Sequence, residues 1–187
     1  GDLNTIRHFY RFDNVEHRQH ARAQMQKSRE WTEFLERSRP LMVTQHSMIY
    51  APCDDVMQSA GTTLIKDIQC SLPDDDPSKR GVYELRNYQL VPGYDTVPKL
   101  RKLFNDGLPD KIAADGHGRL VAFAASDVGI LNNVIELWRY DSMGASIKAR
   151  EASRKATKWR ECIAGVAPLT QTFTTELLVP TAFSPLQ

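Results

Sequence analysis

Charged and aromatic side chains alternate with aliphatic ones along residues 82–91 and residues 134–140. Both segments are rich in Val, Ile, Leu and Tyr, so they read as β-strands. Successive side chains of a strand point to opposite faces, so the alternating members share a face. These members are Glu84, Arg86, Tyr88, Glu136, Trp138 and Tyr140. Two carboxylates, a guanidinium and several rings on one face either line a cavity for a small ligand or fill the space between two sheets.

A third segment, residues 5–12, offers His8 and Tyr10 at equivalent positions. The opposite face of the second segment carries Ile135 and Leu137, which suit packing under helices. We therefore expect the charged and aromatic faces to line the interior between two sheets. Under this assignment all eight residues are predicted cavity-lining residues.

Metal and cofactor chemistry has little support in the sequence. The three cysteines form no C-x-x-C pair, and His17 and His20, three residues apart, have no evident third ligand. There is no phosphate loop, dinucleotide fingerprint, G-x-S-x-G or H-E-x-x-H motif. We expect no metal site and no cofactor, and we assign no catalytic residue.

The composition is that of a folded protein of 187 residues, with 41% hydrophobic and 25% charged residues. The formal net charge of +1 gives no global field for nucleic acid, and no apolar run reaches the ~20 residues of a membrane-spanning helix. The odd cysteine count favours a reducing compartment. Basic residues concentrate between Lys148 and Arg160, a helical stretch that suits either solvent or an acidic surface.

The chain contains an internal repeat. Residues 1–52 align without a gap to residues 129–180, with 14 identical positions out of 52. The repeated residues of structural interest are Arg11, Asp13, Arg22 and Trp31 in the first copy, and Arg139, Asp141, Arg150 and Trp159 in the second. We expect each aspartate to cap a helix, each downstream arginine to reach back to it, and each tryptophan to anchor the helix end in equivalent, mostly buried positions.

Strand and helix signals in the second copy follow the order β-α-β-β-α-β. Strands are expected at 82–91, 119–125, 134–140 and 170–179; one helix begins at Thr96, capped by that threonine, and another follows Ser142 and extends or restarts near Trp159. The helix from Thr96 should bury Val97, Leu100, Phe104 and Leu108. This order predicts an α+β fold with a ferredoxin-like unit.

The first copy contains only the later half of this pattern. It has a strand at Thr5–Phe12, a helix at Val15–Leu35 and a strand at Val43–Tyr50. We therefore divide the chain into an incomplete first repeat (residues 1–52), an acidic linker (53–80), with a short strand at Thr62–Ile68, and a complete second repeat (81–187). A first repeat without its opening strand, helix and second strand predicts that they are supplied by a partner polypeptide, within a hetero- or homo-oligomer, or by an upstream part of the same precursor cut at the turn near Gly1.

Two motifs resemble those of NIPSNAP domains. They are V-Y-E-L-R-x-Y-x-L-x-P-G at residues 82–93 and N-x-V-I-E-L-W-R-Y-D at residues 132–141, followed by Arg150 and Trp159. The C-terminal residues 179–186 are similar to the tail of two-copy animal members. The resemblance implies a dimeric α/β barrel, in which two ferredoxin-like sheets associate face to face. It also implies a mitochondrial location, in the matrix or at the inner membrane with no more than peripheral membrane association.

Two functions compete. The resemblance and the lack of a catalytic signature favour a non-enzymatic protein that acts through protein contacts, as an accessory subunit of a larger mitochondrial assembly. The rival is a small-molecule-binding protein or an enzyme of the cofactor-independent monooxygenase or haem-degrading kind, which would use the cavity around Glu84, Arg86, Glu136 and Trp138. Fold analogy alone supports the rival.

Overall fold

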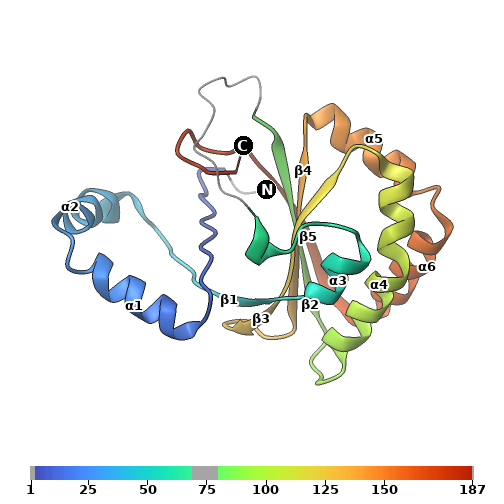
Figure 1. The fold of residues 1–187 in the computed structure, drawn as a ribbon, viewed down its shortest axis with the longest axis horizontal. Helices are drawn as coiled ribbons and strands as arrows, with labels where there is room; N and C mark the ends of the chain where they lie inside the picture. Colours follow the sequence, from blue (N-terminus) through green and yellow to red (C-terminus); the bar gives the residue numbers. More distant parts are fainter. Residues whose placement is uncertain (1–2, 69–79, 187) are drawn as a thin grey trace. The chain divides into compact units, whose positions relative to one another are not determined.

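A computed structural model describes residues 3–68 and 80–186 (Figure 1). The acidic stretch 73–77 and Cys70 lie outside these residues. The chain divides into a small unit of residues 2–47 and a larger unit from residue 48 onward. Each unit is described by itself below.

The larger unit is built on a five-stranded antiparallel sheet. Its strands are β1 (Ile49–Pro52), β2 (Val82–Leu90), β3 (Arg119–Val128), β4 (Asn133–Tyr140) and β5 (Thr170–Leu178). They lie in the order β1-β3-β4-β2-β5, and every neighbouring pair is antiparallel. The four strands predicted for the second copy are therefore present, each within three residues of its expected bounds.

Helices cover one face of this sheet. They are α3 (Asp54–Ser59), α4 (Thr96–Asp115), α5 (Met143–Ser153) and α6 (Thr157–Val166). The larger unit also contains 3-10 turns at Ile65–Asp67 and Ala167–Leu169. In Figure 1, α4, α5 and α6 lie together on the same side of the strands. As predicted, α4 turns one apolar face inward: Leu100, Phe104 and Leu108 are fully buried, and Val97 packs at the edge of the same core. Gly116, with a φ of +63°, ends α4 in the left-handed conformation that glycine adopts without strain.

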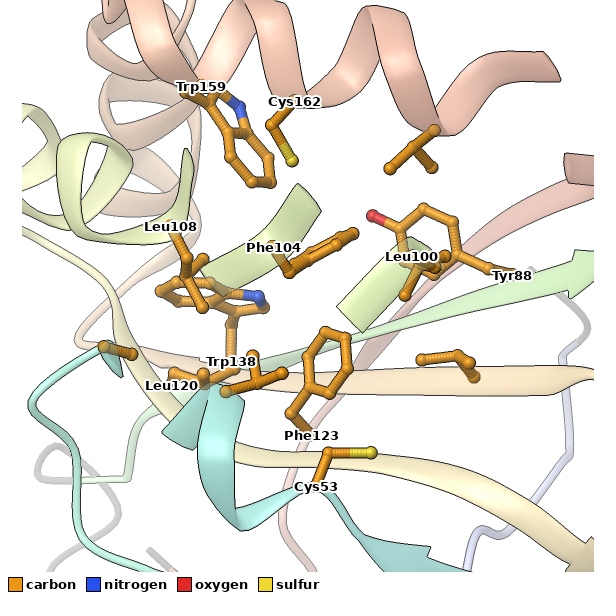
Figure 2. Packing of buried hydrophobic residues seen from close by; sticks show 14 of the residues in the cluster. Cys53, Tyr88, Leu100, Phe104, Leu108, Leu120, Phe123, Trp138, Trp159 and Cys162 are labelled. Atoms are coloured by element: carbon orange, nitrogen blue, oxygen red, sulfur yellow. The ribbon is translucent and has the colours of Figure 1, made fainter. Parts of the chain in front are cut away.

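The main core lies between these helices and the sheet (Figure 2). Phe104 of α4 contacts Trp159 of α6 edge to face, with ring centroids 5.6 Å apart, and Phe123 of β3 at 4.9 Å. A second, smaller cluster lies on the opposite face of the sheet and includes Ile135 and Leu137. The α+β class is thus observed, with apolar residues on both faces of the sheet.

The small unit holds α1 (Val15–Met25), α2 (Arg29–Ser38) and a 3-10 turn at Arg39–Leu41. Adding 128 to each boundary gives the bounds of α5, α6 and the turn at 167–169. Asn4 and Asn132, also 128 apart, both have a positive φ, near 59° and 53°. None of the described residues 3–47 is buried, and residues 5–12 form neither strand nor helix.

Several local predictions need correction. The strand expected at Val43–Tyr50 begins only at Ile49, and the helix expected over Val15–Leu35 is interrupted between Met25 and Arg29. The short strand expected at Thr62–Ile68 is absent, and a 3-10 turn lies there instead. Sequence analysis also missed α3, whose Val56 and Met57 are fully buried in the main core.

The helix caps differ in part from expectation. Ser142 caps α5 as predicted, because its side chain accepts a hydrogen bond from the Ala145 amide. Asn14, not Asp13, caps α1, and Thr96 is the first residue of α4 and donates its hydroxyl to the carbonyl groups of Val91 and Gly93. Among the described residues, no helix combines the length and the apolar character needed to cross a membrane.

Candidate functional site

The predicted cavity-lining residues of the second repeat lie together, but on the helix-covered face of the sheet. Glu84, Tyr88, Glu136, Trp138 and Tyr140 are buried, and Arg86 is nearly so. Tyr88, Trp138 and Tyr140 belong to the main core, whereas Leu85, Ile135 and Leu137 belong to the cluster on the other face. The predicted shared face is confirmed, but its assignment to the interior between two sheets is wrong. These large rings bury their area against the side chains of the helices that cover this face.

Glu136 is fully buried on β4 and holds two hydrogen bonds. The Tyr88 hydroxyl donates to one carboxylate oxygen, and the Trp138 indole Nε1 donates to the other at 2.6 Å. Burial, together with the charge of Glu136, raises the pKa of Tyr88 well above its ordinary value. Tyr88 therefore keeps its proton, and both oxygens of Glu136 remain hydrogen-bonded.

Glu84 is held between two arginines from different elements. Arg86 Nε lies 2.9 Å from Glu84 Oε1, and Arg150 Nη2 of α5 lies 3.2 Å from Oε2. Burial opposes the charge on Arg86, but the nearby Glu136, Tyr88 and Glu84 outweigh it and raise the pKa of Arg86. The expectation that Arg150 reaches back to Asp141 is wrong, since Asp141 pairs with Arg139 at 2.6 Å.

Lys111 of α4 is the buried charged residue of this cluster that sequence analysis missed. Its side chain is only 2% exposed, and Nζ lies 3.2 Å from the ring centroid of Trp138 and 5.0 Å from that of Trp159. No hydrogen-bond partner of Nζ lies within the described residues. Burial first, and then the charge of Arg86, lower the pKa of Lys111 to about 7.

The spacing along α4 contains the signal that would have found Lys111. The buried face runs through Leu100, Phe104 and Leu108, and Lys111 follows at the next step of three, with Asp115 one step of four beyond it. Asp115 is also buried, and its carboxylate accepts hydrogen bonds from the amides of His117 and Gly118 at 2.8 and 2.9 Å.

A pocket of about 450 Å³ opens beside the Glu84 ion pairs, between β2, β5, α5 and α6. It is lined by Arg86, Tyr88, Arg150, Ser153, Arg154, Trp159, Ile163, Val166, Ala167, Thr170, Gln171 and Phe173. Three of these residues are arginines and none is acidic. Lys111 is not among the lining residues, so its amine is separated from the opening.

The remaining predicted residues lie in the small unit, which is described by itself. His8 and Tyr10 stack with ring centroids 6.0 Å apart. Asp13 pairs with His17, at 3.0 Å, rather than with the exposed Arg22. Trp31 stacks on Phe34 at 5.4 Å and is half-buried, whereas Trp159 is buried, so only the second copy has the expected burial. Arg11 is exposed.

The chemistry of this arrangement is that of a partly compensated charge cluster. Two buried carboxylates, Glu84 and Glu136, face two guanidinium groups and an amine whose pKa is lowered by burial to about 7. Arg154 adds a further positive charge at the opening. Within residues 3–68 and 80–186, no group of His, Cys, Asp and Glu side chains is arranged to hold a metal ion. The charges at the opening suit electrostatic binding of an anion.

Comparison with known sequences finds a family model and relatives that share one family name. The family model described as NIPSNAP matches residues 1–56 and 83–185. Human NipSnap homolog 3A is 29% identical over 190 residues, which cover all of this chain and 68% of that protein. NipSnap of Drosophila melanogaster is 31% identical over 118 residues, which cover 58% of this chain and 38% of that protein.

Comparison with solved structures gives the same family name. A NIPSNAP family protein of unknown function from Agrobacterium tumefaciens is 21% identical, with a TM-score of 0.53 over 63% of this chain and all of that one. A NIPSNAP-like domain protein from Burkholderia xenovorans is 26% identical, with a TM-score of 0.52 over 57% of this chain and 90% of that one. These likenesses support the fold of the larger unit.

Proposed function

This chain belongs to the NIPSNAP family, and from this premise we propose that it is a non-enzymatic mitochondrial protein that acts through contacts with other polypeptides. Its role would be that of an accessory subunit in a larger assembly. The mitochondrial location rests on the resemblance of the sequence motifs. Its test is fractionation of cells that express the full-length tagged protein, with matrix and inner-membrane markers; enrichment in the cytosol would contradict it.

The observation that carries the proposal is that residues 5–12 form no strand and expose large apolar side chains. At the repeat offset of 128 these residues correspond to β4, which has β3 on one side and β2 on the other. Residues 5–12 are instead in no strand, and Ile6, Phe9 and Tyr10 are 66%, 49% and 60% exposed. A strand-forming segment with large apolar side chains in water favours pairing with another polypeptide.

The pairing of β1 supports a shared sheet architecture. By sequence β1 lies in the first repeat, since Ile49–Pro52 corresponds to residues 177–180, yet it pairs with β3 of the second. One edge of the sheet of the second repeat is thus formed by a strand of the first. We therefore propose that strands β5-β2-β4-β3 with α4, α5 and α6 form one ferredoxin-like half of a dimeric α/β barrel, and that a partner supplies the strands beside residues 5–12.

The experiment compares the purified full chain with two variants. In Ile6→Asp the charge falls at the position equivalent to Val134, which is fully buried in β4, whereas in Val43→Asp it falls at the position equivalent to the exposed Gln171. Each protein is used to capture partners from a mitochondrial extract, and amide hydrogen exchange of residues 5–12 is then measured in the captured complex.

We expect slow exchange of residues 5–12 in the complex of the wild-type chain and of Val43→Asp, and loss of the complex with Ile6→Asp. Fast exchange of these residues in every complex would contradict the proposal, whatever proteins are captured. Ile6→Asp should leave the unfolding of the larger unit unchanged, because Ile6 is exposed.

A further inference from the structure

We propose that the pocket between β2, β5, α5 and α6 binds an amphipathic organic anion, a carboxylate or phosphate head group joined to an apolar chain. This inference is independent of the proposed pairing of residues 5–12, which belong to the other unit of the chain. It assigns to the larger unit a ligand site whose head-group and chain contacts come from different walls of one pocket.

The side of the pocket that would contact the head group of the ligand is formed by Arg86, Arg150 and Arg154. Arg86 is fixed in place by Glu84, with Nε 2.9 Å from the carboxylate, and its side chain is only 11% exposed. Arg150 contacts the other oxygen of Glu84 through Nη2, at 3.2 Å, while its buried Nε has no hydrogen-bond partner within the described part of the chain. Guanidinium groups held in this way present donors suited to carboxylate and phosphate oxygens.

Arg154 is the residue that favours ligand binding, because compensation of the buried carboxylates does not account for its charge. Arg86 and Arg150 balance the two buried carboxylates, Glu84 and Glu136, because a buried carboxylate without a compensating charge is costly. Arg154 lines the same pocket, is exposed, and forms no ion pair with any described residue. No lining residue is acidic, so Arg154 gives the pocket a positive charge beyond what Glu84 and Glu136 require.

Aromatic and aliphatic residues form the side of the pocket that would contact the apolar chain of the ligand. Trp159 and Val166 belong to the main core and reach the pocket wall, while Ile163 and Phe173 are 37% and 51% exposed at its opening. The Phe173 ring lies against the Tyr88 ring with centroids 4.7 Å apart. The volume of about 450 Å³ falls within the usual range for small-molecule pockets.

The test is calorimetric titration of the full chain with four probes. They are octanoate, octyl phosphate, octan-1-ol and inorganic phosphate. Octanoate and octyl phosphate should bind at least about tenfold more tightly than octanol, which lacks the charge, and octyl phosphate about tenfold more tightly than inorganic phosphate, which lacks the chain. Binding of octanoate without octyl phosphate, or the reverse, identifies the head group and still supports the proposal.

Variants identify the site. Arg154→Ala should weaken octanoate binding about tenfold, and Arg154→Lys should restore part of it. Arg160→Ala removes the same charge from an exposed position of α6 that does not line the pocket, and should bind like the wild type. The proposal is overturned if octanol binds as tightly as octanoate, if inorganic phosphate equals octyl phosphate, or if Arg154→Ala and Arg160→Ala behave alike. Unchanged thermal unfolding of Arg154→Ala shows that its fold is intact.

Discussion

Lys111 carries an amine inside the core, between Trp138 and Trp159. Two effects compete there. Each indole ring attracts the charged form of the amine, but the loss of water around it favours the neutral form. The pKa of Lys111 falls to about 7, which shows that loss of water has the larger effect. The carboxylates that face the amine, Glu136, Asp115 and Glu84, reduce this fall but do not cancel it.

Replacement of Lys111 by Met should therefore change how stability depends on pH. An unfolded lysine keeps its proton to about pH 10.4, while the folded one loses it near 7. Between these values the unfolded state binds more protons, so this group makes wild-type stability rise with pH, by up to about 1.4 kcal/mol per pH unit. We expect Lys111→Met to be more stable than the wild type at pH 6. The difference in their free energies of unfolding should narrow towards pH 10.

Urea unfolding at several pH values measures this gap. Lys102→Met is the matched control, because Lys102 is exposed on the same helix. Its free energy of unfolding should differ from the wild type by an amount that does not vary with pH. A pH-independent gap for Lys111→Met would show that the amine is not desolvated.

The two repeated tryptophans should differ in what they contribute to stability. Trp159 is 6% exposed and contacts Phe104, so Trp159→Ala should cost about 3–5 kcal/mol of unfolding free energy. Trp31 is half-buried against Phe34, so Trp31→Ala should cost less than half as much. Thermal and urea unfolding of both variants compare the costs, and equal losses would contradict the difference in packing.

For single residues, the sequence predicted which side chains share a face of the sheet, but not which layer of the protein covers that face. Strand alternation brought Glu84, Arg86 and Glu136 to one face, because a period of two is a local property of the strand. It could not decide which layer covers that face. The charges that make burial of Glu84 tolerable come from Arg86 and from Arg150 of α5, and the contact with α5 is a tertiary one that no local pattern contains.

At the scale of elements, α4 and α6 approach closely at Gly107. A Cβ atom added there would overlap the Cβ of Cys162 and lie 3.0 Å from the Lys158 carbonyl oxygen. Because this close packing joins two helices of the core, the backbone itself would have to move to make room.

Gly107→Ala should destabilise the larger unit by about 1–3 kcal/mol, since it forces the two helices apart. Gly144→Ala is the control in α5, where the nearest atom to an added Cβ is the Ser142 hydroxyl at 3.8 Å. That variant should gain up to about 1 kcal/mol from helix propensity. Thermal unfolding distinguishes them, and a stabilised Gly107→Ala would contradict the close approach.

Elements with strong local signals could be predicted, and those that depend on neighbours could not. The apolar spacing of α4 and the Ser142 cap of α5 act within one helix, and both appear as expected. A strand needs hydrogen-bonded neighbours, so residues 5–12, which share the pattern of β4, form none. Helix α3 was missed because its six residues are too few to show a period.

At the scale of the molecule, the two units should differ in how readily they open. The larger unit has its own buried core, whereas none of the described residues 3–47 is buried. We expect fast hydrogen exchange and early tryptic cleavage in residues 3–47, with the strands and α4 protected for much longer. Mass spectrometry of a time course measures both, and equal protection of the two units would contradict this expectation.

The boundary between repeats in the sequence and the boundary in the sheet do not coincide. The alignment of the copies ends at Pro52, but β1, which precedes that point, forms the edge of the sheet beside β3, with Tyr50 opposite Ser126. For inheritance this means that the segment that can be passed on with its sheet intact differs from the segment that the sequence alignment of the two copies delimits. A recombination event with its crossover after Pro52 would remove the edge strand from the recipient's sheet, whereas a crossover before Met48 would transfer the sheet complete.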